Sequence, residues 1–596
     1  MCGIFGIVTN EERVLGPTLI EAGHKLSYRG YDTVGAATIP QEGHIDLRKD
    51  KGRVHEVAEK YNFAKMKGNR AILQLRWATF GAPSRLNAQP HLDSDGDLVG
   101  AHNGNVVNNI ELRQQFIAEG MTVRSENDGE SCVHAVERYI DQGLNMIEAI
   151  RQAYADLEGD YSFVIGRVGE DCIYALKKGS GMVVGIAGDS TCVSSDLPSV
   201  LPITRNILRV YDGEIVTLWA DRVEIRAVET GKIIERQPEI VADSMESVQK
   251  GGYAHFMLKE IYDQPKVAAD LLHILENSPD VERMVTRLKA AHNLFLVACG
   301  TSYHACLAGA VYLSRLAGRV AIPILAPQFS AQYGPALNPN DVGIFVSQSG
   351  ETKDVLNAIK VAEAKGMGIL GLVNVIGSTL TQVSETWLPL VCGYEISVPA
   401  TKTFTNQVLA FLYLAMKMGG LDTSILSQIP ELIETTLKMA DPQVAAVEEL
   451  VTPWDDLYIL GYGSTYPLAL EGSLKLKEIT YAHCEGMLST EFKHGPLSAV
   501  TDGFPVIFVA DPENIPLIIS GINEVTCRGA RAIAIGPDDP RLHANAHHRI
   551  VIPNPTPEIY ALLSVLPLQL LSYRMSIARG FDPDFPRNLS KTLTVD

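Results

Sequence analysis

A cysteine directly follows the first methionine, and this position gives it a chemistry that other cysteines lack. Methionine is normally trimmed when the second residue is small, which would leave Cys2 with a free α-amino group beside its own thiol. Such an amine can act as the general base that activates the sulfur, so no separate histidine is needed. Many proteins begin with Met-Cys, and in most of them the cysteine is simply a buried structural residue. The neighbouring motifs therefore decide whether Cys2 is a nucleophile.

Four further residues could bind and activate an α-amino acid amide. A substrate carboxylate needs a cation, and Arg76 offers a bidentate guanidinium group, while Asp128 could hold the substrate ammonium. Attack on the amide creates an oxyanion, which the Asn103 side chain and the Gly104 backbone N–H could stabilise. An isolated Asn-Gly pair is usually only a turn. The chemical interpretation therefore depends on the whole set.

These residues stand in motifs that resemble the N-terminal-nucleophile glutaminase domain of class II amidotransferases: Met-Cys-Gly-Ile at the start, Tyr-Arg-Gly-Tyr-Asp at 28–32, Arg-Trp-Ala-Thr at 76–79 and His-Asn-Gly at 102–104. The resemblance implies Cys2 as nucleophile, Asn103 and Gly104 as oxyanion donors, and Arg29 as a structural brace. It implies that L-glutamine is bound by Arg76, Trp77, Thr79 and Asp128. The family usually has histidine where this chain has Phe80, so glutamine affinity or loop closure is expected to differ.

A second motif, Ser-Gln-Ser-Gly-Glu-Thr at 347–352, lies between an apolar strand at 343–346 and a helix. Hydroxyls and backbone N–H groups in such a loop can cradle a phosphate. The alternative is a simple capping segment, with Ser349 or Thr352 as the helix N-cap.

An internal repeat argues for the phosphate cradle. The segment 294–303 recurs 163 positions later at 457–466, and Gly309 and Gly366 fall on Gly472 and Gly529 at the same offset. Each copy alternates apolar strands with helical stretches, which is typical of a parallel α/β sheet. The second copy reads Ala-Asp-Pro-Glu at the loop position, 510–513, and its negative charge would repel an anion. We therefore expect only the first copy to bind phosphate.

Two features of the C-terminal part of the chain could do chemistry. Glu471, Lys475 and Glu478 have the spacing of one helical face. A solvated, salt-bridged face is the commoner outcome for such residues. Lys591 stands in a partly apolar tail, where a lone lysine would ordinarily serve solubility.

Together with Cys-Gly-Thr-Ser at 299–302, Thr-Lys-Thr-Phe-Thr at 401–405 and Lys-His-Gly-Pro at 493–496, these features resemble the paired sugar-isomerase (SIS) domains of the glucosamine-6-phosphate synthases, and the likeness covers essentially the whole chain. It implies that Lys591 forms a Schiff base with a ketose, that Glu478 moves a proton between C1 and C2, and that His494 assists ring opening. Trp77 would gate a passage for ammonia. The residues expected to bind the sugar phosphate are Thr301, Ser302, Ser347, Gln348, Ser349, Thr352, Glu471 and Lys475.

The reaction implied by this resemblance transfers the amide nitrogen of glutamine to fructose 6-phosphate and isomerises the product to glucosamine 6-phosphate. Ala400 and Phe585 replace a usual serine and glutamine of the family. Ala400 and Phe80 keep amination of a related ketose phosphate open. A sugar-phosphate-sensing regulatory protein would have a DNA-binding segment in place of the glutaminase domain, and the net charge of −19 argues against this alternative. Phosphoribosyl pyrophosphate amidotransferases and asparagine synthetases would need phosphate loops that we do not find.

The length of 596 residues exceeds what one core usually supports. We expect an α+β N-terminal-nucleophile domain over 2–237, with helices near 17–26 and 129–141. A linker over 238–265, two duplicated α/β domains over 266–440 and 441–586, and a tail over 587–596 would follow.

Composition bounds the partners and the compartment. The net charge of −19 argues against nucleic acid and anionic membrane surfaces. Nine scattered cysteines suit a reducing cytoplasm, and the N-terminus lacks the features of a signal peptide. The apolar stretch 559–578 is interrupted by Pro567, Gln569 and Arg574, which favours a buried helix. No cofactor or metal is implied, and the resemblance implies a homodimer in which His494 comes from the neighbouring chain.

Overall fold

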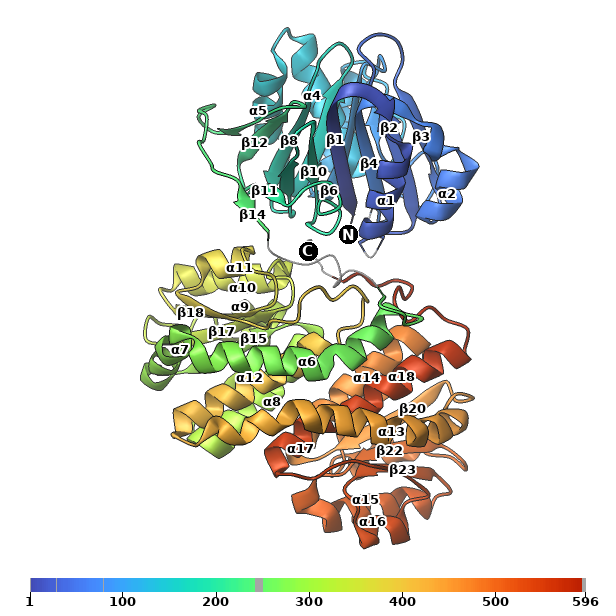
Figure 1. Ribbon diagram of the computed structural model, residues 1–596, viewed down its shortest axis with the longest axis vertical. Coiled ribbons are helices and arrows are strands. Elements are labelled where there is room, and N and C mark those ends of the chain that lie inside the picture. The colour runs from blue at the N-terminus through green and yellow to red at the C-terminus, as the bar shows by residue number, and fades with distance from the viewer. Residues whose placement is uncertain (1, 28, 79, 242–249, 592–596) are drawn as a thin grey trace. The chain divides into compact units, whose positions relative to one another are not determined.

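The computed structural model (Figure 1) describes residues 2–27, 29–78, 80–241 and 250–591. Contacts divide the chain at residue 245 into two compact units. The division agrees with a separate N-terminal domain followed by a larger body that contains both copies of the repeat.

Two antiparallel sheets form the N-terminal unit. The eight-stranded sheet has the order β14-β11-β9-β10-β1-β4-β2-β3, and the six-stranded sheet has the order β13-β12-β8-β7-β6-β5. The bounds of the first are β1 (Gly3–Val14), β2 (Thr33–Thr38), β3 (Asp46–Lys51), β4 (Lys67–Arg76), β9 (Val183–Ile186), β10 (Ser190–Ser194), β11 (Asn206–Arg209) and β14 (Glu239–Ile240). Those of the second are β5 (His91–Leu92), β6 (Leu98–Val106), β7 (Gly159–Arg167), β8 (Ile173–Lys178), β12 (Glu214–Leu218) and β13 (Val223–Ala227).

The first part of β1, up to Thr9, is buried on both faces, and the period of two directs its side chains into two different cores. Ile4 and Val8 belong to a core cluster shared by the two sheets, whereas Phe5 and Ile7 pack with the helices on the outer face. The expected helices are present as α1 (Gly16–Leu26) and α4 (Asp128–Asp141). Three helices were not expected: α2 (Val54–Lys60), α3 (Asn109–Ala118) and α5 (Met146–Asp156).

Two five-stranded parallel sheets form the second unit, with the orders β16-β15-β17-β18-β19 and β21-β20-β22-β23-β24. The two orders are equivalent strand for strand, which confirms the duplication predicted from the repeat. The first sheet comprises β15 (Leu294–Ala298), β16 (Ile322–Leu325), β17 (Val342–Ser347), β18 (Gly368–Val373) and β19 (Thr386–Pro389). The second comprises β20 (Asp456–Gly461), β21 (His483–Leu488), β22 (Pro505–Val509), β23 (Arg531–Gly536) and β24 (His548–Val551).

The helices of this unit alternate with the strands. In the first lobe and its borders they are α6 (Phe256–Asn277), α7 (Pro279–Ala290), α8 (Gly300–Ala317), α9 (Ala326–Tyr333), α10 (Lys353–Ala364), α11 (Thr379–Val383), α12 (Lys402–Gly419) and α13 (Ile429–Val451). In the second lobe they are α14 (Tyr466–Thr480), α15 (Ile515–Thr526), α16 (Pro540–Asn545), α17 (Pro557–Leu563) and α18 (Leu566–Ala578). One hydrophobic cluster runs from Met257 to Met575 through both lobes, so they share a core.

The repeated glycines Gly309 and Gly472 have the same packing function. A Cβ atom on Gly309 of α8 would lie 2.6 Å from the Phe411 ring, and one on Gly472 of α14 would lie 2.4 Å from Leu568. The missing side chain therefore lets α8 approach α12, and α14 approach α18, at a distance that alanine would not allow.

Two of the predicted domain borders fall inside helices. The border at 265/266 lies within α6, which continues through Pro265, and the border at 440/441 lies within α13. Proline removes the hydrogen bond that the Ile261 carbonyl would accept, but Gln264 Nε2 donates to this oxygen at 2.8 Å. The helix can therefore continue where the sequence suggests a break.

One stretch in the described part of the chain, Pro557–Ala578, is long and apolar enough to cross a membrane. Its apolar window is 78% buried inside the protein, and α17 and α18 belong to the core that the lobes share. This burial agrees with the prediction of a core helix.

Candidate functional site

The Cys2 side chain is buried at the beginning of β1. Its Sγ lies 3.7 Å from the Trp77 carbonyl oxygen, to which the thiol donates, and Arg29 Nε donates to the Cys2 carbonyl at 3.2 Å. Arg29 thus contacts the backbone of the nucleophile, as expected of a brace. A Cβ atom on Gly30 would lie 2.7 Å from the Arg76 carbonyl carbon, so glycine is needed where these segments cross.

Arg76 lies at the end of β4 and is 1% exposed. One terminal nitrogen, Nη2, donates to the carbonyl oxygens of Phe80 and Gly81. Its other terminal nitrogen, Nη1, is buried without a hydrogen-bond partner among the described residues. An unpaired guanidinium N–H group is a suitable donor for a carboxylate. Burial lowers the pKa of Arg76, which Cys2 and Asp128 oppose.

Asp128 begins α4 and is fully buried. Its Oδ2 accepts the Val106 N–H at 3.0 Å and lies 3.2 Å from His102 Nε2. Burial acts to raise the pKa of this carboxyl, but His102 and the backbone bond outweigh it and the net shift is downward. Asp128 is therefore an anion, and His102 is a partner for which sequence reasoning assigned no role.

The two predicted oxyanion donors lie on β6. Asn103 Nδ2 donates to Ser195 Oγ at 2.8 Å, and Ser195 Oγ also accepts the Ile4 N–H at 2.6 Å. Asn103 is thus linked to the strand that follows Cys2, and an amide NH₂ group has a second hydrogen to donate. Gly104 has φ +113°, and a Cβ atom there would lie 2.2 Å from the Asp160 carbonyl oxygen. Only glycine suits this position.

Of the predicted glutamine-binding residues, Thr79 lies outside the described residues. The Trp77 ring packs edge-on against Tyr31, with 5.8 Å between the ring centres. The structure therefore brings Trp77 and Cys2 together, whereas the predicted ammonia passage remains a prediction.

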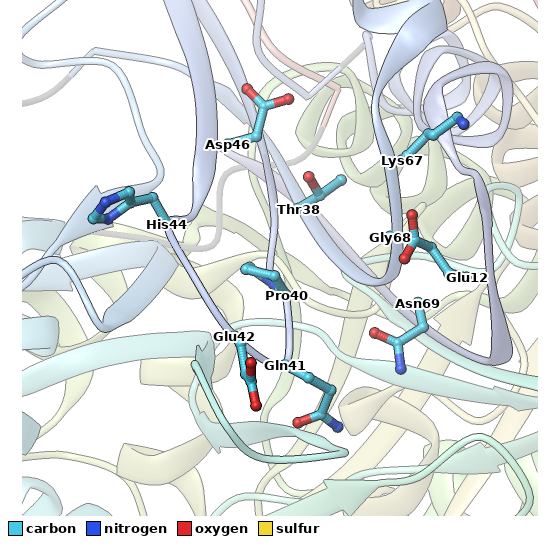
Figure 2. A pocket seen from close by; sticks show the side chains of 10 residues that line it. All are labelled: Glu12, Thr38, Pro40, Gln41, Glu42, His44, Asp46, Lys67, Gly68 and Asn69. Atoms are coloured by element: carbon cyan, nitrogen blue, oxygen red, sulfur yellow. The ribbon is translucent and has the colours of Figure 1, made fainter.

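Figure 2 shows a different pocket of the N-terminal unit, of about 400 Å³. It lies at the other end of β1 from Cys2, and no predicted site residue lines it. Its lining consists of Glu12, Thr38, Pro40, Gln41, Glu42, His44, Asp46, Lys67, Gly68 and Asn69.

In the second unit, the loop at 347–352 connects β17 to α10. Ser347 Oγ accepts the Gly350 N–H at 2.9 Å and lies 2.9 Å from Thr352 Oγ1. Thr352 is the N-cap residue, but its side chain makes no capping bond to the helix. Thr352 thus has the N-cap position that the capping alternative gave it, but its hydroxyl lies against Ser347 instead of capping the helix. Ser349 Oγ accepts the Glu351 N–H at 3.1 Å within the loop.

The equivalent loop of the second lobe holds its own carboxylate. Asp511 is buried and accepts hydrogen bonds from the Glu513 N–H and from Asn514 Nδ2. Its Oδ2 would lie 2.8 Å from a Cβ atom on Gly463, whereas nothing lies within 4 Å of such an atom on the equivalent Gly300. The cradle of the second lobe is thus filled by Asp511, and the position in the first lobe is open.

Glu471, Lys475 and Glu478 lie on one face of α14, and this face is turned inward. Lys475 Nζ lies 3.3 Å from Glu471 and 2.5 Å from Glu478, and its side chain is 1% exposed. Burial lowers the pKa of Lys475, but the two carboxylates raise it by more. Burial also raises the pKa of Glu478, which suits a group that must take up and release a proton. Lys477, by contrast, is exposed.

The first lobe contributes to the same network. Thr301 Oγ1 donates to Glu471 at 3.0 Å, and His304 Nδ1 lies 2.8 Å from its other oxygen. Ser302 Oγ accepts a hydrogen bond from Gln407 Nε2 at 2.9 Å. The prediction did not include His304, because a histidine inside a helix has no distinguishing pattern in the sequence.

Lys591 is paired with a carboxylate that sequence reasoning missed. Its Nζ lies 2.6 Å from Glu395 Oε2, and the two side chains are 4% and 0% exposed. Thr401 and Thr403 donate backbone hydrogen bonds to Glu395. A charged residue within the mostly apolar segment 388–398 was the available signal.

His494 is not brought to these residues within the chain. It ends a short helical turn, Phe492–His494, and is exposed. Its backbone N–H bonds to Glu491.

Two protein-family models match the chain. The glutamine amidotransferase domain matches residues 76–200, which include Arg76, Asn103 and Asp128. The SIS domain matches twice, over 287–417 and 450–579, once on each copy of the repeat.

Similar proteins align over the whole chain. The glutamine–fructose-6-phosphate aminotransferases (isomerizing) of Pyrobaculum aerophilum, Methanothermobacter thermautotrophicus and Aquifex aeolicus are 38%, 37% and 36% identical, each over 100% of both chains. The chain belongs to this aminotransferase family. A solved structure of the C-terminal domain of glucosamine-fructose-6-phosphate aminotransferase from Francisella tularensis is 30% identical, with a TM-score of 0.53, and covers 57% of this chain and 100% of that chain.

Membership of the aminotransferase family accounts for a glutaminase-like unit and two sugar-isomerase lobes in one chain. The resemblance predicted histidine at position 80, where this chain has Phe80. Phe80 contributes its carbonyl oxygen to Arg76, so this contact does not depend on the side chain.

Proposed function

We propose that this protein transfers the amide nitrogen of L-glutamine to fructose 6-phosphate and isomerises the product to glucosamine 6-phosphate, releasing glutamate. The observation that carries the proposal is the full-length similarity to aminotransferases of that name, at 34–38% identity. The buried networks around Cys2 and Lys591 supply the chemistry that both half-reactions need.

In the first half-reaction, the Cys2 sulfur attacks the amide carbon of glutamine while its own α-amino group takes the thiol proton. Asn103 and Gly104 stabilise the oxyanion. Arg76 Nη1 binds the substrate carboxylate and Asp128 binds its ammonium group. Ammonia then leaves, and water hydrolyses the thioester to glutamate and free Cys2.

In the second half-reaction, the phosphate binds at Ser347, Gln348, Ser349 and Thr352, together with the turn that contains Ser302. The Lys591 amine adds to C2 of the open-chain ketose and water is lost, which forms an imine. Ammonia replaces Lys591 at C2.

Proton transfer completes the isomerisation. Glu478 takes a proton from C1 and a proton is delivered to C2, which leaves an aldehyde at C1 and an amine at C2. Glu471 and Lys475 orient the sugar.

We further propose a cytoplasmic homodimer, in which the exposed His494 of one chain assists ring opening at the site of its partner. Trp77 and the C-terminal tail would guide ammonia between the two reactions. The substitution at Ala400 favours testing related ketose phosphates as alternative acceptors.

A coupled assay tests the proposal. The purified protein is given glutamine and fructose 6-phosphate, and glutamate and amino-sugar phosphate are both quantified by mass spectrometry, with Cys2→Ala as control. Glucosamine 6-phosphate is expected in step with glutamate, and the control should lose both. Glutamate without amino sugar would contradict the proposed acceptor and leave the glutaminase assignment intact.

A further inference from the structure

The Lys591 ammonium group is held in the protein interior by one direct ionic partner among the described residues. Glu395 Oε2 lies 2.6 Å from Lys591 Nζ, and both side chains are almost completely buried. An ammonium group loses much of its hydration free energy on burial, so a missing partner would leave it strongly destabilised. The carboxylate is therefore what allows a charged Lys591 to remain at this place.

Glu395 is in turn fixed by hydrogen bonds from the N-cap residue and the first turn of α12. The Thr401 N–H donates to Oε1 at 2.9 Å and the Thr403 N–H at 3.1 Å, while Thr403 Oγ1 donates to Oε2 at 2.6 Å. These donors all favour the ionised form. Burial acts to raise the pKa of Glu395, but Lys591 and Thr403 outweigh it and lower the pKa to about 2. The carboxylate is thus ionised beside the charged Lys591.

Several ionisable groups surround Lys591 besides Glu395. The positive charge of Lys591 acts to lower the pKa of Glu478 of α14, of Glu260 of α6 and of Cys392 in the loop after β19. Lys402 of α12 also faces Glu260, and it pairs with Asp263 at 3.5 Å. Burial raises the pKa of both Glu260, to about 7, and Glu478. The pKa shifts of Glu260 and Glu478 are thus upward, whereas that of Glu395 is downward.

We propose that Glu395 is the counter-ion and positioning residue of Lys591, holding Nζ as an ammonium group in the free enzyme and as a protonated imine once the ketose has reacted. This inference rests on the proposed function. When the ketone reacts, Nζ forms a bond to C2 and gives up two of its three protons, which leave as water with the former carbonyl oxygen. The resulting iminium nitrogen retains one N–H and one positive charge. The same carboxylate therefore serves both states without taking up a proton.

Trapping of the imine tests this role. The full-length protein is incubated with fructose 6-phosphate and cyanoborohydride across a range of pH, and the reduced adduct on the Lys591 peptide is quantified by mass spectrometry. In Glu395→Gln, the pH at which trapping is half-maximal should fall by about 1–3 units, because an opposite charge at this range favours the protonated amine by that amount. The plateau yield should fall at least tenfold, because the iminium loses its counter-ion.

Thr403→Val is the matched control. It removes the hydrogen bond from the Thr403 hydroxyl to Glu395 but leaves the carboxylate charge, so its trapping midpoint should equal that of the wild-type chain. If Thr403→Val shifts the midpoint as far as Glu395→Gln does, loop disorder explains the effect and the counter-ion role is overturned. An unmoved midpoint in Glu395→Gln overturns it equally.

A wild-type chain that gives no adduct at Lys591 overturns the proposed Schiff-base chemistry itself, which distinguishes that failure from a failure of Glu395 alone. If Glu395→Gln does not fold, Glu395→Asp replaces it. Aspartate keeps the negative charge but places it one methylene farther from Lys591 Nζ. The trapping midpoint should therefore be retained, while the trapping rate should fall about tenfold, which corresponds to about 1.4 kcal/mol of lost stabilisation. An unchanged rate in Glu395→Asp would overturn the positioning role.

Discussion

The Glu471 carboxylate of α14 accepts a hydrogen bond from Thr301 Oγ1 of α8 at 3.0 Å. A buried side chain of the second lobe thus braces the turn that follows the first strand of the first lobe. His304 of α8 lies against the other oxygen of this carboxylate, and Lys475 neutralises it from within α14. The two lobes of the repeat therefore meet at a charged network as well as at an apolar core.

Replacement of Glu471 by alanine should destabilise the second unit by about 3–5 kcal/mol, because it leaves Lys475 buried with one carboxylate fewer. Guanidinium unfolding of the full-length protein would measure the change. Lys477→Ala, on the exposed face of the same helix, should change the free energy of unfolding by less than about 0.5 kcal/mol. Equal effects of the two substitutions would contradict a special role for the network.

Ser347→Ala should raise the KM for fructose 6-phosphate about 10- to 100-fold, since a hydrogen bond to a charged group contributes about 1.5–3 kcal/mol. Steady-state kinetics at saturating glutamine would measure it. Asp511→Asn, in the equivalent loop of the second lobe, should leave this KM unchanged. A similar rise in both variants would mean that the phosphate does not distinguish the lobes.

Glu478→Gln should lower the rate of amino-sugar formation about 10²- to 10⁴-fold, the usual contribution of a general acid–base group. Glutamate release by the same preparation should persist, because that reaction takes place in the other unit. Burial raises the pKa of Glu478, so the acidic limb of the wild-type profile for amino-sugar formation should lie above pH 4.5. An acidic limb that survives unchanged in Glu478→Gln would assign it to another group.

His134 of α4 should make the stability of the N-terminal unit pH-dependent. Its Nδ1 lies 2.5 Å from Glu137, and its Nε2 lies 3.7 Å from Glu130. Burial acts to lower its pKa, but the two carboxylates raise it from 6.5 to about 9. The stabilisation is therefore fully present below about pH 6.5 and is lost as the pH rises through about 9.

Calorimetry of the full-length protein at pH 6 and pH 9.5 would test this dependence. The wild-type chain should lose on the order of 3 kcal/mol between the two pH values through this group. His134→Gln should be less stable than the wild-type chain at pH 6 and should approach it at pH 9.5. A difference that grows with pH would have the wrong sign and would reject the ion-pair explanation.

Local pattern explains which features could be predicted from the sequence. The motifs around Cys2 and the loop at 347–352 are contiguous, so their order along the chain is visible without a fold. The repeat predicted two duplicated lobes with parallel sheets, and the strand order that the two sheets share agrees with this duplication. The face formed by Glu471, Lys475 and Glu478 follows from helical periodicity alone.

Long-range packing decided the remainder. The sequence could not show that the face of α14 is buried, since the same spacing also suits a solvated helix. It could not pair Lys591 with Glu395, because the two are 196 positions apart and no local pattern connects them. It placed a border at Pro265, where a side chain of the same helix replaces the missing backbone hydrogen bond. The residue types and their order thus determined the chemistry available to this protein. The burial of each ionisable side chain and its hydrogen-bonding or ionic partner, which together set its charge state, depended on the tertiary structure.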